Sequence, residues 1–472
     1  MREKRRTLSE RAEDRVPLSR ASEDAFARLR ANGWFRETGK LAFTHDVNQE
    51  EDGSVYGYPG GMIYARPTFA NGLSPVFRLG PSDALVLTVC TPPPSRYFGL
   101  STYVWRRQGD LGIVTSRVVS ATLANEQVNM LTMNNATARH PAFGQPLVLI
   151  TTADEATFRE ISGAFVDAGV PVEAINLEAI PRAKLGRSLV LDGADDLTFS
   201  LRSALWPDET EDGAYSLGTY AKQEWSSVFI ARSPRGGSRL VRPLEAIDVA
   251  SSPRGAPLAN KEETLLASAL ALASAVEQRL VTSAGLTRLK EGRMQHVDVD
   301  RDRCLRDRRY SPFRLAGASG VNIRSGCFGE TGDCTYAISD VILPAARPFV
   351  ALFVGADHRA LGNSAFSNVA AYNSGGALSA VSAGNVEVVG YADDRMWRRR
   401  DGSGVFALVF ASEGLCGERT KEDLAKMDVP CVEIPTRRFN EVFFISRDYV
   451  DPATGTAPNS EEMLETRVLY FE

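Results

Sequence analysis

The chain has 472 residues, of which 43% are hydrophobic and 24% charged, and its formal net charge is −5. This composition is typical of a globular protein and excludes a wholly disordered one, while the length predicts two or three domains. The acidic balance gives no electrostatic reason to expect nucleic acid as a partner.

The N-terminal part, residues 1–33, predicts a charged segment followed by a short helix. Within SEDAFARLRANG, Ser22 is suited to cap the start of this helix and Gly33 to end it. No apolar stretch follows the basic start, so we expect no secretory signal in this chain. Residues 34–81 are rich in glycine, proline and aromatic residues, which favours short strands and loops.

Two predicted strands surround a run of three prolines. Ala84–Cys90, ALVLTVC, is an apolar strand, and the prolines end it because proline cannot donate to a strand ladder. In the next strand, Tyr97, Tyr103 and Trp105 share one face. Their amphipathic rings suit either the wall of a ligand site or packing against a second core layer, and Arg96 could lie over one ring.

The segment 146–178 has the pattern of a βαβ unit. An apolar strand leads to Thr152 as the expected N-cap of a helix, whose apolar face carries Phe158, Ile161 and Phe165. Gly169 is suited to end this helix, and a second strand follows it. The connection carries no phosphate-binding loop.

The second half of the chain predicts one long helix and then mainly strands. Residues 254–309 form a linker, a helix at Glu262–Val281 and a charged connector. The helix has one stripe that we expect to be buried, made of Leu266, Leu270, Ala273 and Val276. The apolar run of this helix is about 12 residues, whereas a membrane span needs about 20, so we expect a buried helix and no membrane partner. From residue 310 strands alternate with turns, with one short helix at Lys421–Met427.

These patterns predict an α/β or α+β fold that is strand-rich, with two packed sheet-containing halves and a few helices. The expected divisions are a charged segment with a short helix (1–33), a strand-rich α/β half (34–253), a linker region with the long helix (254–309) and a β-rich half (310–472). No sequence period of 20–50 residues is present, so a repeat architecture is not expected.

The six cysteines leave two compartments open. Pairs Cys327/Cys334 and Cys416/Cys431 each bracket a short segment, and Cys90 with Cys304 would complete three disulfides. Spacing alone cannot choose among the connectivities or between disulfides and reduced thiols. A reduced chain would be soluble and cytoplasmic, whereas a disulfide-bonded one would be secreted and would require a leader that was removed.

Several familiar site motifs are missing from the sequence. It contains no glycine-rich phosphate loop, no dinucleotide fingerprint, no His-Glu-x-x-His, no paired Cys-x-x-Cys and no nucleophile elbow. With four histidines in all, a histidine-rich metal centre is not expected. We therefore expect neither a cofactor nor a metal.

The strongest candidate for chemistry is His358, at the end of the apolar strand FVALFV. A histidine there could act as a general acid or base, although Asp357, as its neighbour on an extended chain, should point away from it. The alternative is a turn in which Asp357 acts as a cap. Asn322 and Arg324, in a glycine-rich segment, could bind an anion or could belong to a simple hairpin loop.

Two functions follow from these candidates. The first is a cofactor-independent hydrolase or lyase acting on a small polar or anionic substrate in a cleft between the halves. Its catalytic residues would be His358, Tyr97 and Tyr103, and its substrate-binding residues Arg96, Trp105, Arg324 and Asn322. The second is a non-catalytic β-rich protein that binds a ligand or partner, and the cysteines leave open whether it is secreted. An assembly protein is a third. The sequence does not indicate the oligomeric state.

Overall fold

The structure is a computed structural model in which the chain divides into two compact units. Unit 1 comprises Met1–His45 and Ile63–Val249, and unit 2 comprises Asp46–Met62 and Ala250–Glu472. The residues that the structure describes are 18–44, 62–69, 76–107, 117–122, 128–133, 142–180, 196–204, 226–235, 258–297, 303–304, 313–316, 322–325, 331–339, 343–344, 347–373, 387–397, 401–435, 441–453 and 455–472.

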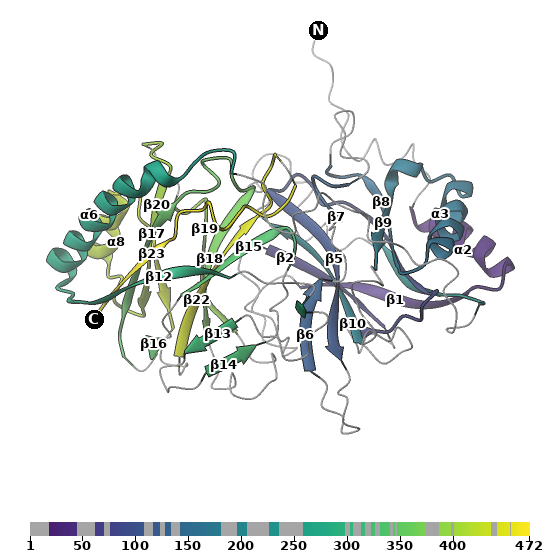
Figure 1. Ribbon diagram of the computed structural model, residues 1–472, viewed down its shortest axis with the longest axis horizontal. Coiled ribbons are helices and arrows are strands. Elements are labelled where there is room, and N and C mark those ends of the chain that lie inside the picture. Colours follow the sequence, from purple (N-terminus) through teal and green to yellow (C-terminus); the bar gives the residue numbers. More distant parts are fainter. Residues whose placement is uncertain are drawn as a thin grey trace, which may run out of the picture. The chain divides into compact units, whose positions relative to one another are not determined.

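Unit 1 is a strongly curved sheet with helices on one face (Figure 1). Its strands run in the order β6-β5-β10-β2-β1-β11-β4-β8-β9, and the described pairings are antiparallel except that of β8 with β9. The elements are α2 (Leu18–Ala31), β1 (Phe35–Thr44), β2 (Met62–Thr68), β3 (Val76–Phe77), β4 (Ala84–Cys90), β5 (Tyr97–Arg107), β6 (Arg117–Thr122), β7 (Val128–Asn129), β8 (Pro146–Thr152), α3 (Glu155–Asp167), η1 (Val172–Ala174), β9 (Ile175–Ala179), β10 (Asp196–Ala204) and β11 (Ser227–Arg232).

Unit 2 has a second curved sheet with its own helices (Figure 1). Its strands run β19-β18-β22-β15-β12-β23-β17-β20-β21, with β20 and β21 parallel. The elements are η3 (Glu263–Leu265), α6 (Leu266–Ala284), β12 (Arg288–Val297), β13 (Phe313–Ala316), β14 (Asn322–Ser325), β15 (Cys334–Ser339), β16 (Leu343–Pro344), β17 (Val350–Ala356), β18 (Phe366–Asn373), β19 (Glu387–Asp393), β20 (Val405–Ser412), α8 (Glu418–Ala425), β21 (Cys431–Ile434), β22 (Glu441–Tyr449) and β23 (Arg467–Phe471).

The strand-rich character with few helices is confirmed, and so are the strands at Ala84–Cys90 and Tyr97–Trp105. The βαβ unit is present as β8, α3 and β9, but its N-cap is Asp154, whose side chain accepts from Thr157 N. Thr152 instead ends β8, where its hydroxyl donates to the carbonyl of Asp83 at 2.8 Å. The predicted cap was therefore wrong by two residues.

The first helix was also placed too far along the chain. It begins at Leu18, so Ser22 lies inside it and does not cap it; the Ser22 hydroxyl lies 3.0 Å from that of Ser227. Gly33 follows the helix with φ +84°, a left-handed conformation that glycine adopts without strain. The end of the helix, unlike its start, was predicted correctly.

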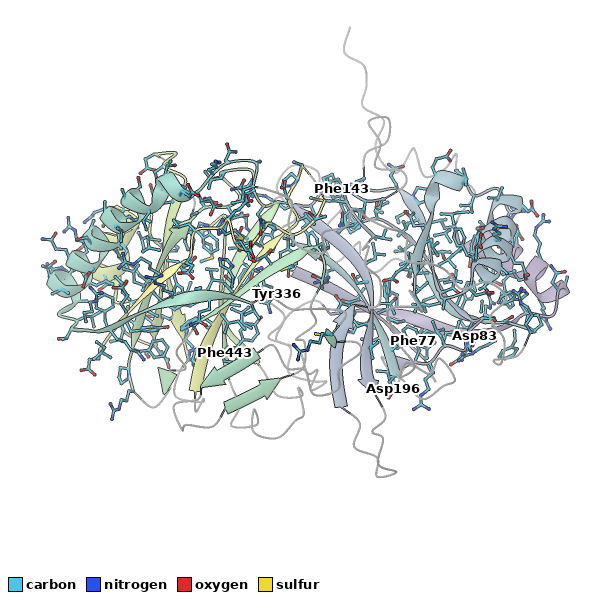
Figure 2. All side chains as sticks on the ribbon, viewed as in Figure 1. Phe77, Asp83, Phe143, Asp196, Tyr336 and Phe443 are labelled. Atoms are coloured by element: carbon cyan, nitrogen blue, oxygen red, sulfur yellow. A yellow bond between two sulfur atoms is a disulfide. The ribbon has the colours of Figure 1, made fainter. Side chains whose placement is uncertain are left out.

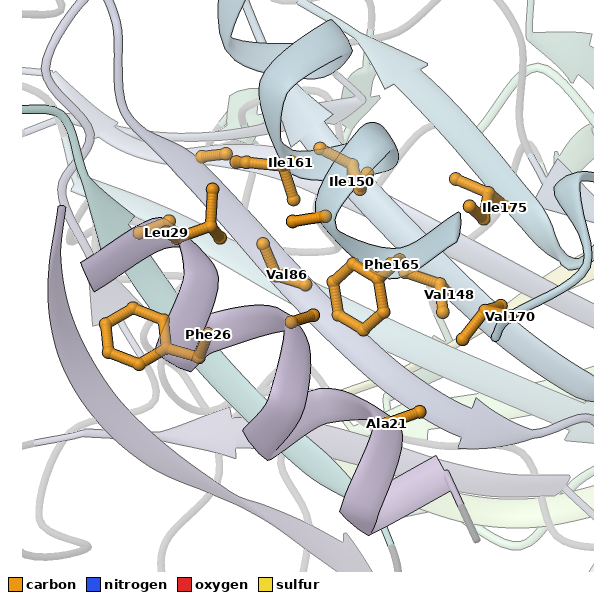
Figure 3. Packing of buried hydrophobic residues seen from close by; sticks show 14 of the residues in the cluster. Ala21, Phe26, Leu29, Val86, Val148, Ile150, Ile161, Phe165, Val170 and Ile175 are labelled. Atoms are coloured by element: carbon orange, nitrogen blue, oxygen red, sulfur yellow. The ribbon is translucent and has the colours of Figure 1, made fainter. Parts of the chain in front are cut away.

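In unit 1, α2 and α3 pack side by side on the sheet (Figure 3). Phe26 and Leu29 of α2 meet Ile161 and Phe165 of α3, all less than a tenth exposed, over apolar strand residues such as Val86. Burying a side chain of this size stabilises the fold by about 1.5–3 kcal/mol.

In unit 2, α6 packs on β17 and β20 through one apolar side. That side carries Ala269, Leu272, Ala273, Val276 and Leu280. The prediction that Leu266 and Leu270 belong to the buried stripe was wrong, because they are 47% and 39% exposed. Among the described helices, Glu263–Ala284 is long and apolar enough to cross a membrane, judged by length and composition.

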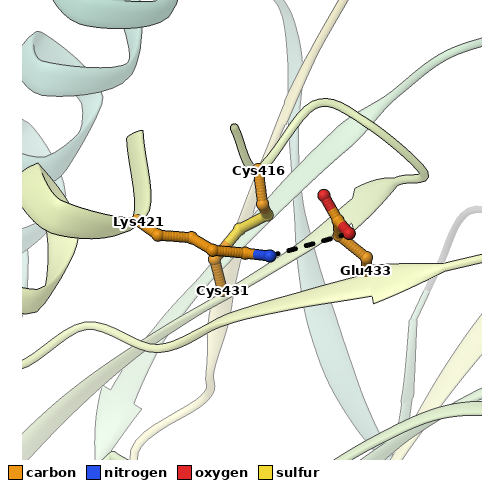
Figure 4. The surroundings of a disulfide bond; sticks show 4 residues. All are labelled: Cys416, Lys421, Cys431 and Glu433. Atoms are coloured by element: carbon orange, nitrogen blue, oxygen red, sulfur yellow. Dashed lines mark ion pairs between the residues drawn. A yellow bond between two sulfur atoms is a disulfide. The ribbon is translucent and has the colours of Figure 1, made fainter. Parts of the chain in front are cut away.

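A disulfide joins Cys416 and Cys431 across the β20–α8–β21 crossover (Figure 4). Beside it, Lys421 of α8 forms an ion pair with Glu433 of β21 at 3.6 Å. Cys304 is disulfide-bonded as well, whereas Cys90 and Cys334 keep their thiols. Of the candidate pairings, Cys416–Cys431 is therefore formed, whereas Cys90–Cys304 and Cys327–Cys334 are not.

We expect alkylation of the denatured, unreduced chain to label two cysteines, Cys90 and Cys334, and alkylation after reduction to label all six. Intact-mass measurement before and after reduction gives both counts. Six labels without reduction would contradict both disulfides.

Candidate functional site

His358 lies in the turn after β17 and is 5% exposed. Its Nδ1 is 2.7 Å from Oε1 of Glu262, a fully buried carboxylate just before η3. Asp357, its neighbour, instead accepts the backbone N–H of Ala360 at 3.0 Å and stabilises the turn. The partner of His358 is therefore 96 residues away in the sequence.

Glu262 also binds two further groups from separate parts of unit 2. Asn363 Nδ2 donates to Oε1 at 2.8 Å, and the backbone N–H of Leu464 donates to Oε2 at 2.8 Å. Asn363 donates as well to the carbonyl of Asn260 at 2.9 Å. One carboxylate thus ties the start of the long helix to the turn after β17 and to the segment before β23.

The electrostatics of this cluster favour a charged His358. Burial alone lowers the pKa of a histidine, but the negative charges of Asp448, Glu262 and Asp357 outweigh it and raise the pKa of His358 to about 9. Burial raises the pKa of Glu262. The positive charge of His358 and the hydrogen bonds to Glu262 lower it by more than burial raises it, so the net shift is downward.

Two more buried groups face the same cluster. Burial raises the pKa of Asp448, against the opposing effect of His358. Burial and the positive charge of His358 lower the pKa of His296, on β12, to about 4. At neutral pH the cluster therefore contains a protonated His358 and a neutral His296. A protonated imidazole can donate a proton but cannot accept one, and the acid–base role of His358 stays a prediction.

The pH dependence of stability tests this arrangement. Because the folded pKa of His358 lies near 9 and its ordinary value is 6.5, its contribution is complete below about pH 6.5 and is lost as the pH rises through 9. We expect the wild-type free energy of unfolding to fall by about 3 kcal/mol more than that of His358→Asn between pH 6.5 and pH 10. Urea unfolding at a series of pH values measures both curves.

Equal losses for the two proteins would show that His358 is not charged in the folded state.

As a second measurement, Glu262→Gln should destabilise the protein at pH 6.5 by about 3–5 kcal/mol, because it leaves a buried imidazolium without its ion pair. The exposed Glu465→Gln, which loses the ion pair with Arg293, is a matched control and should change stability by less than about 1 kcal/mol.

A second polar group lies on the other face of the same sheet. Arg447 of β22 stands directly opposite Tyr336 of β15 and Asn368 of β18, so the three side chains form a row across three neighbouring strands. Figure 2 marks Tyr336 in this position. The Arg447 guanidinium lies 5.6 Å from the ring centre of Tyr336 and 5.3 Å from that of Tyr372.

The ring of Tyr372 is held by a neighbouring aromatic side chain. Tyr372 stacks on Phe443 with ring centres 5.5 Å apart, and both lie in strands of the sheet (Figure 2 marks Phe443). Burial raises the pKa of Tyr372, and a hydrogen bond from Arg447 opposes that rise. The guanidinium is thereby held between two aromatic faces, a geometry in which arginine is favoured over lysine.

Asn368 is the unusual member of this row. It is 1% exposed, yet among the residues that the structure describes neither its amide nitrogen nor its amide oxygen has a hydrogen-bond partner. Asp393, which stands opposite it on β19, is engaged by Arg395 at 3.0 Å. A buried amide without partners is rare, because leaving such a group unsatisfied costs about 1–3 kcal/mol.

The predicted site residues are spread over both units. Tyr97 and Tyr103 lie in β5 of unit 1, are 0% and 4% exposed and share one face, and Arg96 precedes them half-buried. His358 belongs to unit 2. Asn322 and Arg324 lie in β14, which pairs with β13 in a small sheet. The structure describes their backbone and that of Trp105, but not the three side chains.

Sequence reasoning missed Glu262, Arg447 and Asn368. Glu262 reads as an ordinary first-turn acid of a helix, and NEVFFISRD as a plain strand. The alternation Phe443, Ile445, Arg447 could have placed the arginine on one face, but only the register identifies Tyr336 and Asn368 as its neighbours. Within the described part of the chain, no three His, Cys, Asp or Glu side chains gather where they could hold a metal ion.

No protein family model matches this chain, and no curated protein matches it. A crystal structure of an uncharacterised protein from Burkholderia cenocepacia is similar over 99% of this chain and 90% of the other, with 11% identity and a TM-score of 0.38. The partial N-terminal region of an enterococcal surface protein covers 90% of this chain and 85% of its own, with 8% identity and a TM-score of 0.16. Neither likeness is close enough to inform fold or function.

Proposed function

We propose that this protein is a non-catalytic binding protein, and that it holds a small anionic ligand at Arg447 in unit 2. The observation that carries the proposal is the row Tyr336–Arg447–Asn368, in which a guanidinium between two rings lies beside a buried amide that has no hydrogen-bond partner in the described part of the chain. A ligand with a carboxylate or phosphate group would satisfy the donor of that amide and pair with the planar guanidinium.

The alternative of a hydrolase or lyase receives less support from the same side chains. Its acid or base, His358, is buried and paired with Glu262 at 2.7 Å, which favours a structural role over proton transfer at neutral pH. Its two tyrosines, Tyr97 and Tyr103, are buried in a different unit.

The disulfides favour the secreted form of this binding protein. Cys416–Cys431 and the disulfide at Cys304 would form and persist in an oxidising compartment, and they are rare in reducing ones. A protein that meets its ligand outside the cell is consistent with a fold held by covalent links in addition to its core.

The proposal predicts stabilisation by anions. Citrate and inorganic phosphate, added separately at constant ionic strength, should raise the unfolding temperature of the full chain, because binding at one hundred times Kd adds about 2.7 kcal/mol. Arg447→Gln should abolish the rise. Arg293→Gln, which removes the same charge from a largely exposed side chain in the same unit, should preserve it.

Asn368→Leu separates binding from folding. Because it removes two unsatisfied polar atoms at similar size, it should fold at least as well as the wild type. It should still weaken the response to citrate, since the ligand loses its amide contact. An unchanged response in both Asn368→Leu and Arg447→Gln would refute the site.

A further inference from the structure

The two sheets have the same topology. Read from one edge to the other, the strand order of unit 1 is β6-β5-β10-β2-β1-β11-β4-β8-β9, and that of unit 2 is β19-β18-β22-β15-β12-β23-β17-β20-β21. When the nine strands of each path are ranked by their order along the chain, strands at the same place in the two sheets have the same rank. In both, a helix (α2 or α6) precedes the first strand, and a second (α3 or α8) lies in the parallel crossover. Agreement over nine strands is not expected of unrelated sheets.

The register of the strands agrees as well. In unit 1, Gly39, Val228 and Leu87 stand opposite one another across β1, β11 and β4. In unit 2, Gly292, Val468 and Phe353 do so across β12, β23 and β17. Each first helix ends at a left-handed glycine, Gly33 with φ +84° and Gly285 with φ +67°.

Local hydrogen bonds match at the entry to β5 and β18. The Ser95 hydroxyl donates to the carbonyl of Tyr97 at 3.2 Å, and the Ser364 hydroxyl donates to that of Phe366 at 2.7 Å. In each unit, the residue that follows the serine donates its backbone N–H to a carbonyl at the end of the neighbouring strand. Arg96 donates to Ala204 O and Ala365 donates to Tyr449 O, both at 3.0 Å.

This alignment places two arginines at one position. Counting back two residues from Ala204 and Tyr449 reaches Arg202 and Arg447, which stand opposite Gly99 and Asn368. Four residues further along β5 and β18 are Tyr103 and Tyr372, each on the same face as its arginine. The strand pairs β10–β5 and β22–β18 thus carry an arginine on the first strand and a tyrosine on the second at matching positions.

We infer that the chain is a tandem of two copies of one domain, and that Arg202 with Tyr103 forms in unit 1 a second anion site equivalent to that of Arg447. The second half of this inference rests on the proposed function. Gly99 replaces Asn368, so the unit 1 site lacks the amide and should bind the anion more weakly. Each unit has its own buried apolar core, so each should unfold as a separate cooperative unit.

Scanning calorimetry of the full chain tests both parts of this inference. Two transitions are expected, and each can be assigned by a variant in one unit. Glu178→Ala, which removes a buried hydrogen-bonded carboxylate from unit 1, should lower one transition by several degrees. Removal of the Cys416–Cys431 disulfide by two serine substitutions should lower the other.

Citrate then reports the two sites separately. Both transition temperatures should rise with citrate, and that of unit 1 should rise by less. Arg202→Gln should cancel the increase in unit 1 alone, and Arg447→Gln should cancel the increase in unit 2 alone. A rise confined to unit 2 would overturn the second site and leave the proposed function intact. No rise in either transition would overturn the proposed function together with the second site. A single transition, lowered equally by both marker variants, would overturn two independently folding copies.

Discussion

The fold of unit 2 depends on one buried carboxylate. Glu262 accepts hydrogen bonds from His358, Asn363 and the backbone of Leu464, and so joins three segments that are far apart in sequence. A buried charge is tolerable only when it is paired and fully hydrogen-bonded, so these segments must all be in place for Glu262 to be stable. Glu262 thereby fixes the turn that carries His358, and the segment before β23, to the start of the long helix.

Unit 1 uses a different carboxylate in a comparable way. Glu178 of β9 accepts the backbone N–H and the hydroxyl of Thr102 on β5, and the hydroxyl of Thr151 on β8, each at 2.6 Å. Since β9 and β5 lie near opposite ends of the strand order, this side chain draws the sheet into a nearly closed curve. Burial raises the pKa of Glu178, and the three donors oppose that rise.

Comparison of the units separates what the fold requires from what one unit added. The positions of His296, His358 and Asp448 in unit 2 correspond to Phe43, Pro92 and Ser203 in unit 1 by strand register and residue count. Unit 1 forms the same sheet without ionisable groups there, so the fold itself does not impose that cluster. In contrast, each unit has an arginine at the matching position, Arg202 in unit 1 and Arg447 in unit 2.

The sequence alone determined the local elements of this protein. Apolar runs, prolines and capping residues indicated β4, β5, the β8–α3–β9 crossover and the two later helices, because these depend on neighbours within a few residues. Helix starts were less accurate at α2, where a tertiary contact of Ser22 with Ser227 outweighed its preference for a cap.

Only the tertiary structure decided which of these elements meet. The partner of His358 is 96 residues away and that of Glu178 is 76 residues away, and no local pattern encodes such distances. The likeness of the two halves was hidden for the same reason: strand order and register are properties of pairing, and many different apolar residues satisfy one pairing. A sequence can therefore lose its visible repeat while the hydrogen-bonded topology that it specifies remains the same.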